Sequence, residues 1–158
     1  SIFFDSIRKF KFKYLPRKGF VKYDGKISED YLKNYNFIKY EYANKNYNLE
    51  VLNKRYEQRV KNYLVRVDLL AKYSKKIKSI PIFINNIGSK GHQEMIFTLN
   101  NSLINHCVIR NYNCIDLAKK LDPQKGLWID GAHTTKMGSS VIADTIYPEI
   151  KKIITELN

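Results

Sequence analysis

The sequence IPIFIN at residues 80–85 has apolar side chains at almost every position and is rich in isoleucine. A run of this length without polar alternation is typical of a strand buried on both faces, as in a parallel sheet. Parallel strands need crossover connections, which are usually helices. We therefore expect an α/β chain with helices on either side of this strand.

The flanking segments carry the patterns that such a fold requires. Residues 49–78 predict one long helix, because apolar residues recur along one face at helical spacing. Residues 92–107 predict a second helix, and NYNCIDL at 111–117 predicts a short strand followed by a brief helix at 118–121. The apolar face of the long helix consists of Tyr56, Val60, Tyr63, Leu64, Val67 and Leu70.

A last helix begins at Gly138, and Pro148 is expected to kink or restart it. The order helix, strand, helix, strand, helix predicts parallel strands with crossover helices. Two central strands are too few for a stable open sheet, so either strands are missing or the first 50 residues supply them. The apolar stripe of the last helix consists of Val141, Ile142, Ile146, Ile150, Ile153 and Ile154.

The first 48 residues differ from the rest of the chain in composition. Pro16, Gly19 and Gly25 interrupt a segment rich in Tyr, Asn and Lys, which predicts loops and short helices packed by aromatic rings. We treat residues 1–48 as an irregular basic and aromatic insertion and residues 49–158 as the main domain. The chain starts without Met or a signal-peptide pattern, as after an internal cut. No apolar run approaches the ~20 residues of a membrane-spanning helix.

The net charge of +13 is concentrated in the first half of the chain. Residues 1–80 carry 20 Lys and Arg against 8 Asp and Glu, and residues 81–158 carry 8 against 7. This surplus either attracts phosphates or anionic lipid or forms a solvated surface. Aromatic and basic residues interleave in KYLPRKGFVKY, but no RNP, KH or helix-turn-helix signature is present, so nucleic acid is not the expected partner.

Cysteine and histidine usage gives little sign of a metal or a disulfide framework. Cys107 and Cys114 do not form a CxxC pair, and we expect both to be buried free thiols. The three histidines lack Cys or Glu companions at ligand spacing. We therefore predict no metal site and no cofactor.

The segment LWIDGAHTTKMG at 127–138 contains the best candidate for catalytic chemistry. Asp130 and His133 follow a short apolar run and precede the last helix. In α/β sheets functional groups gather at the carboxyl ends of strands. A histidine there can act as a general base if a carboxylate holds its other ring nitrogen, and an aspartate three residues earlier can reach it. The alternative is that Asp130 caps a turn and His133 is an ordinary loop residue.

Neighbouring residues fit supporting roles. Thr135 is expected to cap the last helix, and Gly138 to allow close backbone packing. Asp116 is expected to cap the brief helix that follows it.

Three other residues have both a structural and a functional interpretation. His92 is either a substrate contact or a surface loop residue, and Trp128 is either core or a wall of the pocket. His106, late in a helix, needs no more than a cationic or capping role.

The string IDGAHTTKMGSSVIADTIY resembles the last conserved block of the SGNH (GDSL) hydrolases, with Asp130, His133, Thr135, Gly138 and the Ile142-Ala143 pair at matching positions. The segments IPIFIN and NYNCIDL resemble the strands that precede this block, so the resemblance covers about residues 50–158. It implies a flavodoxin-like three-layer α/β sandwich and hydrolysis or transfer of acyl esters. It further implies that His133 activates a serine and that Asp130 orients His133.

The chain departs from that family in its first half. No G-x-N-D motif is present, and SIFFDSI at 1–7 has Phe4 where the family has a Gly before its Asp-Ser. Ser6 is therefore one candidate nucleophile, and a serine outside this chain is the other. We expect the C-terminal part of an ester hydrolase acting on a small-molecule, lipid or sugar O-acyl ester. The alternatives are a basic binding module and an inactive hydrolase homologue.

Overall fold

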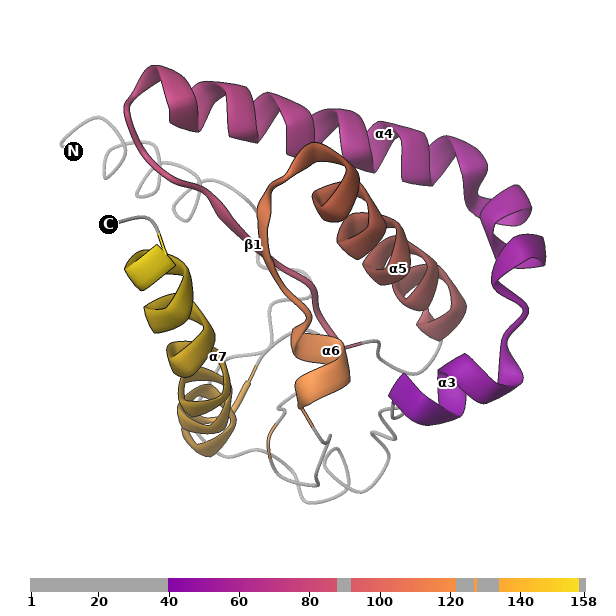
Figure 1. The fold of residues 1–158 in the computed structure, drawn as a ribbon. Coiled ribbons are helices and arrows are strands. Elements are labelled where there is room, and N and C mark those ends of the chain that lie inside the picture. Colours follow the sequence, from indigo (N-terminus) through magenta and orange to yellow (C-terminus); the bar gives the residue numbers. More distant parts are fainter. Residues whose placement is uncertain (1–39, 88–91, 122–126, 128–133, 157–158) are drawn as a thin grey trace, which may run out of the picture.

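The computed structural model describes residues 40–87, 92–121, 127 and 134–156 (Figure 1). The elements predicted within residues 49–156 are present in the predicted order, with ends that differ by a few residues. The elements are α3 (Tyr40–Asn46), α4 (Leu49–Lys76), β1 (Ile82–Ile84), α5 (Gln93–Arg110), β2 (Asn113–Ile115), α6 (Leu117–Lys120) and α7 (Lys136–Glu156).

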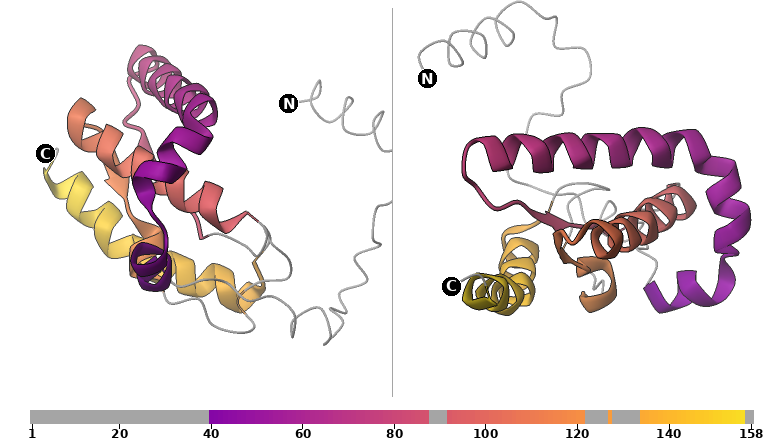
Figure 2. Two further views of the ribbon diagram at one scale, coloured as in Figure 1. Left: turned by 90° about the vertical axis from the view of Figure 1, so that its right-hand side faces the viewer. Right: turned by 45° about the horizontal axis from the view of Figure 1, so that its top comes forward.

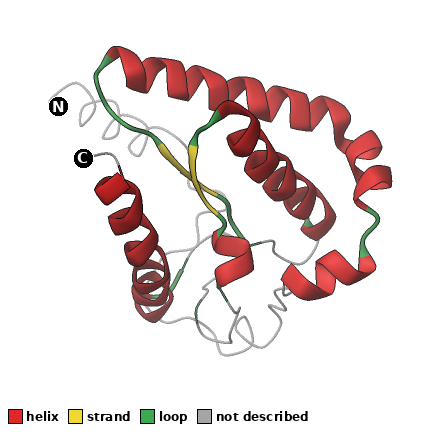
Figure 3. Cartoon of the chain, in the orientation of Figure 1, coloured by secondary structure: helices red, strands yellow, loops and turns green. Residues whose placement is uncertain are grey.

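The two strands form a small parallel sheet. Phe83 of β1 lies opposite Cys114 of β2, and α5 connects the two strands. In Figures 1 and 3 the strand pair lies between α5 on one side and α7 on the other. The predicted parallel α/β arrangement is confirmed in this limited form, whereas a three-layer sandwich is not seen among the described residues.

Burial of β1 on both faces, predicted from its sequence, is wrong. Ile82 and Phe83 are half-buried, and Ile84 is 38% exposed. A strand is covered on both faces only where helices or further strands flank it on each side. Within the described part of the chain β1 pairs with β2 alone, so it is an edge strand.

Helix α4 begins and ends at residues suited to those positions. The side chain of Asn48 accepts a hydrogen bond from the Val51 amide at 3.1 Å, which caps the first turn. At the other end Lys78 has a φ of 55°, and the Ser79 amide donates to the Ser74 carbonyl at 2.9 Å. This is the Schellman arrangement, and it turns the chain from the helix toward β1.

The predicted apolar face of α4 packs on α5 along most of its length. Val67 is buried against Leu103 and Cys107, with Tyr63 beside them. Leu70, which we assigned to the same face, is 58% exposed. It lies three residues after Val67, on the edge of the stripe that turns away from α5.

The prediction of two free thiols is wrong, because Cys107 and Cys114 form a disulfide. Helix α5 ends where Asn111 adopts a left-handed conformation with a φ of 54°, which Asn tolerates better than most residues. The Tyr112 amide then donates to the Cys107 carbonyl at 2.9 Å. This reversal returns the chain along α5 and brings the two Cα atoms to 6.2 Å, within disulfide range.

Helix α7 runs through Pro148 as one helix, so the predicted restart does not occur. The carbonyl that Pro148 leaves without its helical partner belongs to Asp144, which is exposed and reachable by water. Val141, Ile142 and Ile146 pack against the core as predicted. Ile154, at the far end of the same stripe, is 53% exposed.

The short helix α3 and the residue that follows it pack on α5 through aromatic rings. Tyr40 and Tyr47 lie 5.7 and 5.6 Å from Phe97 between ring centroids, as predicted for short aromatic-packed helices in this part of the chain. The boundary between residues 48 and 49 stays a prediction. None of the helices in the described ranges has the length and apolarity that a bilayer crossing requires.

Candidate functional site

The carboxyl ends of the two strands each place a polar side chain at the same edge of the sheet. Asn85 follows β1 and is only 4% exposed, and Asp116 follows β2. The Asn85 amide nitrogen donates to Asp116 Oδ1 at 2.7 Å, and its oxygen accepts from the Ala118 amide at 2.9 Å. Asn85 therefore ties β1 to the start of α6, and both ends of its buried side-chain amide have a partner.

Asp116 caps α6, as predicted. Its Oδ1 atom accepts from the Lys119 amide at 3.2 Å as well as from Asn85. The pKa of Tyr40 is raised by burial and, to a smaller extent, by the negative charge of Asp116. Tyr40 stays neutral and donates to the side-chain oxygen of Asn101 at 3.2 Å.

The side-chain amide of Asn100 holds the residues after β1 against α5. The Asn86 amide donates to the Asn100 side-chain oxygen at 3.4 Å, and the Asn100 side-chain nitrogen donates back to the Asn86 carbonyl. Asn100 is 8% exposed. Beside it a cavity of about 20 Å³, room for one water, is lined partly by Ile87 and Phe97.

The two flanks of the predicted catalytic block meet at this same edge. Leu127, which is 2% exposed, packs with Ile87 after β1 and Leu117 after β2. Its carbonyl accepts a hydrogen bond from the Thr135 amide at 2.9 Å. Leu127 and Thr135, which lie on either side of Asp130 and His133 in the sequence, are therefore joined by a backbone hydrogen bond.

Thr135 and Gly138 have the roles predicted for them. Thr135 Oγ1 accepts from the Gly138 amide at 3.0 Å, which caps α7. A Cβ atom at Gly138 would overlap the Leu127 carbonyl oxygen and would lie 2.7 Å from its carbon. Only glycine lets α7 approach the base of the loop this closely.

Asp130, His133 and Trp128 lie outside the described residues, and so does Ser6. The structure thus brings together Leu127, Thr135 and Gly138 around the block, while the catalytic pair itself stays a prediction. His92, at the start of α5, is exposed. In the part of the chain that is described, no three or more His, Cys, Asp and Glu side chains form a group able to hold a metal ion.

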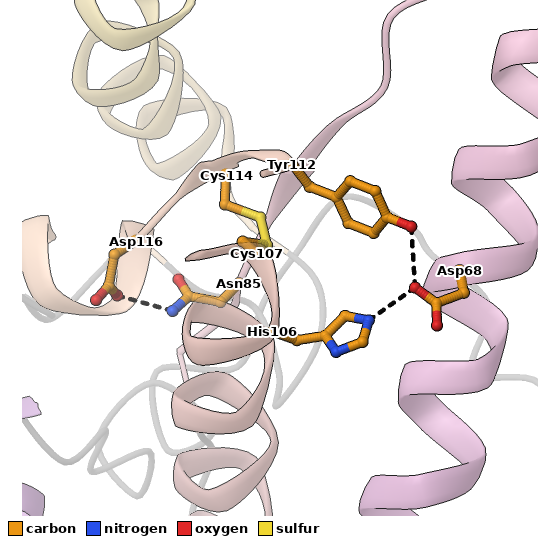
Figure 4. Close-up of a disulfide and its surroundings, with 7 residues drawn as sticks. All are labelled: Asp68, Asn85, His106, Cys107, Tyr112, Cys114 and Asp116. Carbon is orange, nitrogen blue, oxygen red and sulfur yellow. Dashed lines mark hydrogen bonds and ion pairs between the residues drawn. A yellow bond between two sulfur atoms is a disulfide. The ribbon is translucent and has the colours of Figure 1, made fainter. Parts of the chain in front are cut away.

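A second Asp–His pair, which the sequence did not predict, joins α4 to α5 (Figure 4). His106 Nε2 lies 2.7 Å from Asp68 Oδ1, and the Tyr112 hydroxyl donates to the same oxygen at 3.0 Å. Arg110 lies 3.6 Å from the other carboxylate oxygen. The partners come from residues 38 or more positions apart, so no local motif announces them.

The protonation of Asp68 follows from these contacts. Burial would raise its pKa, but the hydrogen bonds from His106 and Tyr112 and the nearby positive charges outweigh burial, and the pKa falls below its usual value. Burial raises the pKa of Tyr112, and its hydrogen bond to Asp68 raises it further. With two hydrogen bonds and one ion pair on its carboxylate, Asp68 joins the two helices, and we assign this pair a structural role.

Models of known protein families, curated proteins and solved structures were all compared with the chain, and none matches.

Proposed function

We propose that this chain is the C-terminal part of a serine ester hydrolase of the SGNH type, with His133 as general base and Asp130 orienting it. The observation that carries the proposal is the closure of the loop between Leu127 and Thr135 beside the carboxyl ends of β1 and β2. Parallel α/β sheets build their active sites at this edge. The hydrogen bond between Leu127 and Thr135 brings the two flanks of this segment together, which suits a support for a histidine and its carboxylate.

Three further features support the proposal. The strands are parallel with a helical crossover, which is the arrangement that the resemblance implies. Thr135 caps α7, and Gly138 lets α7 pack closely against Leu127. Both residues therefore stabilise the backbone next to the block. The full three-layer sandwich is part of this proposal.

The proposed chemistry is acyl transfer in two steps. His133 takes the proton of a serine hydroxyl as the serine oxygen attacks the ester carbonyl, and Asp130 stabilises the resulting imidazolium. The protonated His133 then gives its proton to the departing alcohol. Water then attacks the acyl-serine in the same way, with His133 again taking and returning a proton. The acid is released and the serine is restored.

The test uses the full-length gene product and a short-chain p-nitrophenyl ester. His133→Ala should lower kcat/KM by at least roughly 10³-fold, and Asp130→Ala by roughly 10²-fold or more. Lys136→Ala is the matched control, because it removes an exposed side chain at the start of α7, next to the block. If both block variants keep the parent rate while folded by circular dichroism, the proposal is wrong.

The nucleophile can be identified in the same preparation. A fluorophosphonate probe should label one serine in the parent protein and label it far more slowly in His133→Ala, because the hydroxyl has lost its base. Mass spectrometry of the labelled peptide then decides between Ser6 and a serine elsewhere in the gene product. Labelling at the same rate in both proteins would contradict a role for His133.

A further inference from the structure

Helix α4 carries a second apolar face that points away from α5. Val65, Leu69, Tyr73 and Ile77 follow one another at intervals of four residues, and they are 51%, 45%, 59% and 73% exposed. The buried residue Val67 lies two positions from Val65, about 200° around the helix. The exposed stripe is therefore separate from the face that packs on α5, and Figure 2 shows α4 along one edge of the described structure.

Two further exposed apolar residues extend this group, one beside Leu69 on α4 and one three residues after the C-cap Ile77. Leu70 is 58% exposed and Ile80 is 56% exposed. Single exposed apolar side chains are ordinary, but a contiguous group marks an interaction site. We define the α4 patch as Val65, Leu69, Leu70, Tyr73, Ile77 and Ile80.

The α4 patch is surrounded by positive charge. Residues 65–80 contain five basic residues and a single acidic one, Asp68, which already binds His106 and Arg110. Lys76 Nζ lies 5.6 Å from the centre of the Tyr73 ring, so charge and apolar surface are directly adjacent. The basic residues are Arg66, Lys72, Lys75, Lys76 and Lys78.

We propose that the α4 patch binds the surface of an anionic lipid bilayer. An amphipathic helix with apolar side chains beside lysines lies in the bilayer interface, where the apolar groups enter the acyl boundary and the ammonium groups reach the phosphates. A polynucleotide would use the lysines and Tyr73 but offers no site for the aliphatic residues. A second copy of this chain, with its net charge of +13, would meet the same positive rim.

The test measures co-sedimentation of the full chain with phosphatidylcholine vesicles that contain or lack phosphatidylglycerol. We expect binding to the anionic vesicles only, and weaker binding as salt is raised. Lys75→Gln with Lys76→Gln should lower the partition coefficient roughly 10- to 30-fold, because each lysine near such a surface contributes about a fivefold factor. Tyr73→Ser with Ile77→Ser should lower it by a similar factor.

Matched controls distinguish binding through the α4 patch from the nonspecific effect of losing charge or apolar surface elsewhere on the chain. Lys151→Gln with Lys152→Gln removes the same charge from α7, and Val108→Ser with Ile109→Ser removes two apolar residues that are each 79% exposed. Both controls should bind like the parent. The proposal is overturned if controls and patch variants weaken binding equally, or if neutral vesicles bind as well. A second result would also overturn the proposal and indicate nucleic acid as the partner. In that result a polynucleotide displaces the chain from vesicles, and the lysine variant loses polynucleotide binding while the Tyr73 and Ile77 variant keeps it.

Discussion

The two ends of the β1–β2 sheet are held together by different chemistry, and Figure 4 shows both ends on either side of the disulfide. Cys114, the middle residue of β2, is bonded to Cys107, and Tyr112, just before the amino end of β2, donates to Asp68. At the carboxyl end, Asp116 accepts from Asn85. The first set joins two long helices and a strand, whereas the second organises loops.

The Asp68–His106 pair and the proposed Asp130–His133 pair follow the same division. Asp68 and His106 meet across two helices at the amino end, and the carboxylate also accepts from Tyr112 and lies near Arg110. Asp130 and His133 are three residues apart in a loop whose base lies at the carboxyl end. The comparison teaches that an Asp–His contact alone does not identify catalysis. Its position relative to the strands and the other partners of the carboxylate have to be considered as well.

The largest effect on the carboxyl end of the sheet is expected from a substitution at Gly138. Gly138→Ala gains about 1 kcal/mol of helix propensity, but its Cβ would overlap a backbone carbonyl that cannot move without opening the loop. We expect a net loss of about 3 kcal/mol or more in the free energy of unfolding. Urea denaturation measures the loss, and Ser140→Ala, an exposed position in the same helix, should leave stability within about 0.5 kcal/mol. An unchanged midpoint for Gly138→Ala would mean that α7 does not pack against Leu127.

Removing the disulfide tests the amino end in the same way. The bond closes a loop with a sequence separation of 7, and the chain-entropy estimate for such a loop is about 2.5 kcal/mol. Cys107→Ser with Cys114→Ser should lose roughly that amount in urea denaturation, and adding dithiothreitol to the parent should reproduce the loss. If dithiothreitol destabilises the double variant as much as the parent, the effect does not come from this bond.

The features predicted correctly from the sequence are local ones. Thr135 and Asp116 each accept from an amide three residues ahead, and this short-range geometry is encoded by the residue type and its place before a helix. The parallel pairing of β1 and β2 followed from a helix between two apolar runs. Gly138 is local in the same sense, because it faces the base of the loop that precedes its own helix.

The features that were missed depend on how separate segments meet. Asp68 and His106 are 38 residues apart, and nothing in either segment specifies the other. The disulfide depends on the left-handed turn at Asn111, without which a separation of 7 would leave the thiols apart. On α4 the periodicity identified most of one apolar face but wrongly included Leu70, and it could not show that Val65, Leu69 and Tyr73 form an exposed second face.

The smallest expected effect concerns pH and the Asp68 carboxylate. Its pKa is lower in the folded protein than in the unfolded chain, so the unfolded state binds more protons in the acid range. The stability that Asp68 contributes is therefore fully present above its unfolded pKa of about 3.9 and is lost as the pH falls through the folded pKa. The side chain is 34% exposed, so solvent screening keeps this contribution at or below about 1 kcal/mol.

Asp68→Asn isolates that contribution, because it removes the titrating group at nearly constant volume. We expect Asp68→Asn to be slightly less stable than the parent at neutral pH and to lose less stability than the parent between about pH 5 and pH 2. Asp144→Asn, which changes an exposed carboxylate on α7, is the matched control and should follow the parent curve. The measurement is the free energy of unfolding by urea at each pH. Parallel curves for Asp68→Asn and the parent would mean that the carboxylate is not held by His106 and Tyr112. The amino end would then depend on the disulfide and apolar packing alone, and the contrast with the hydrogen-bonded carboxyl end would become sharper.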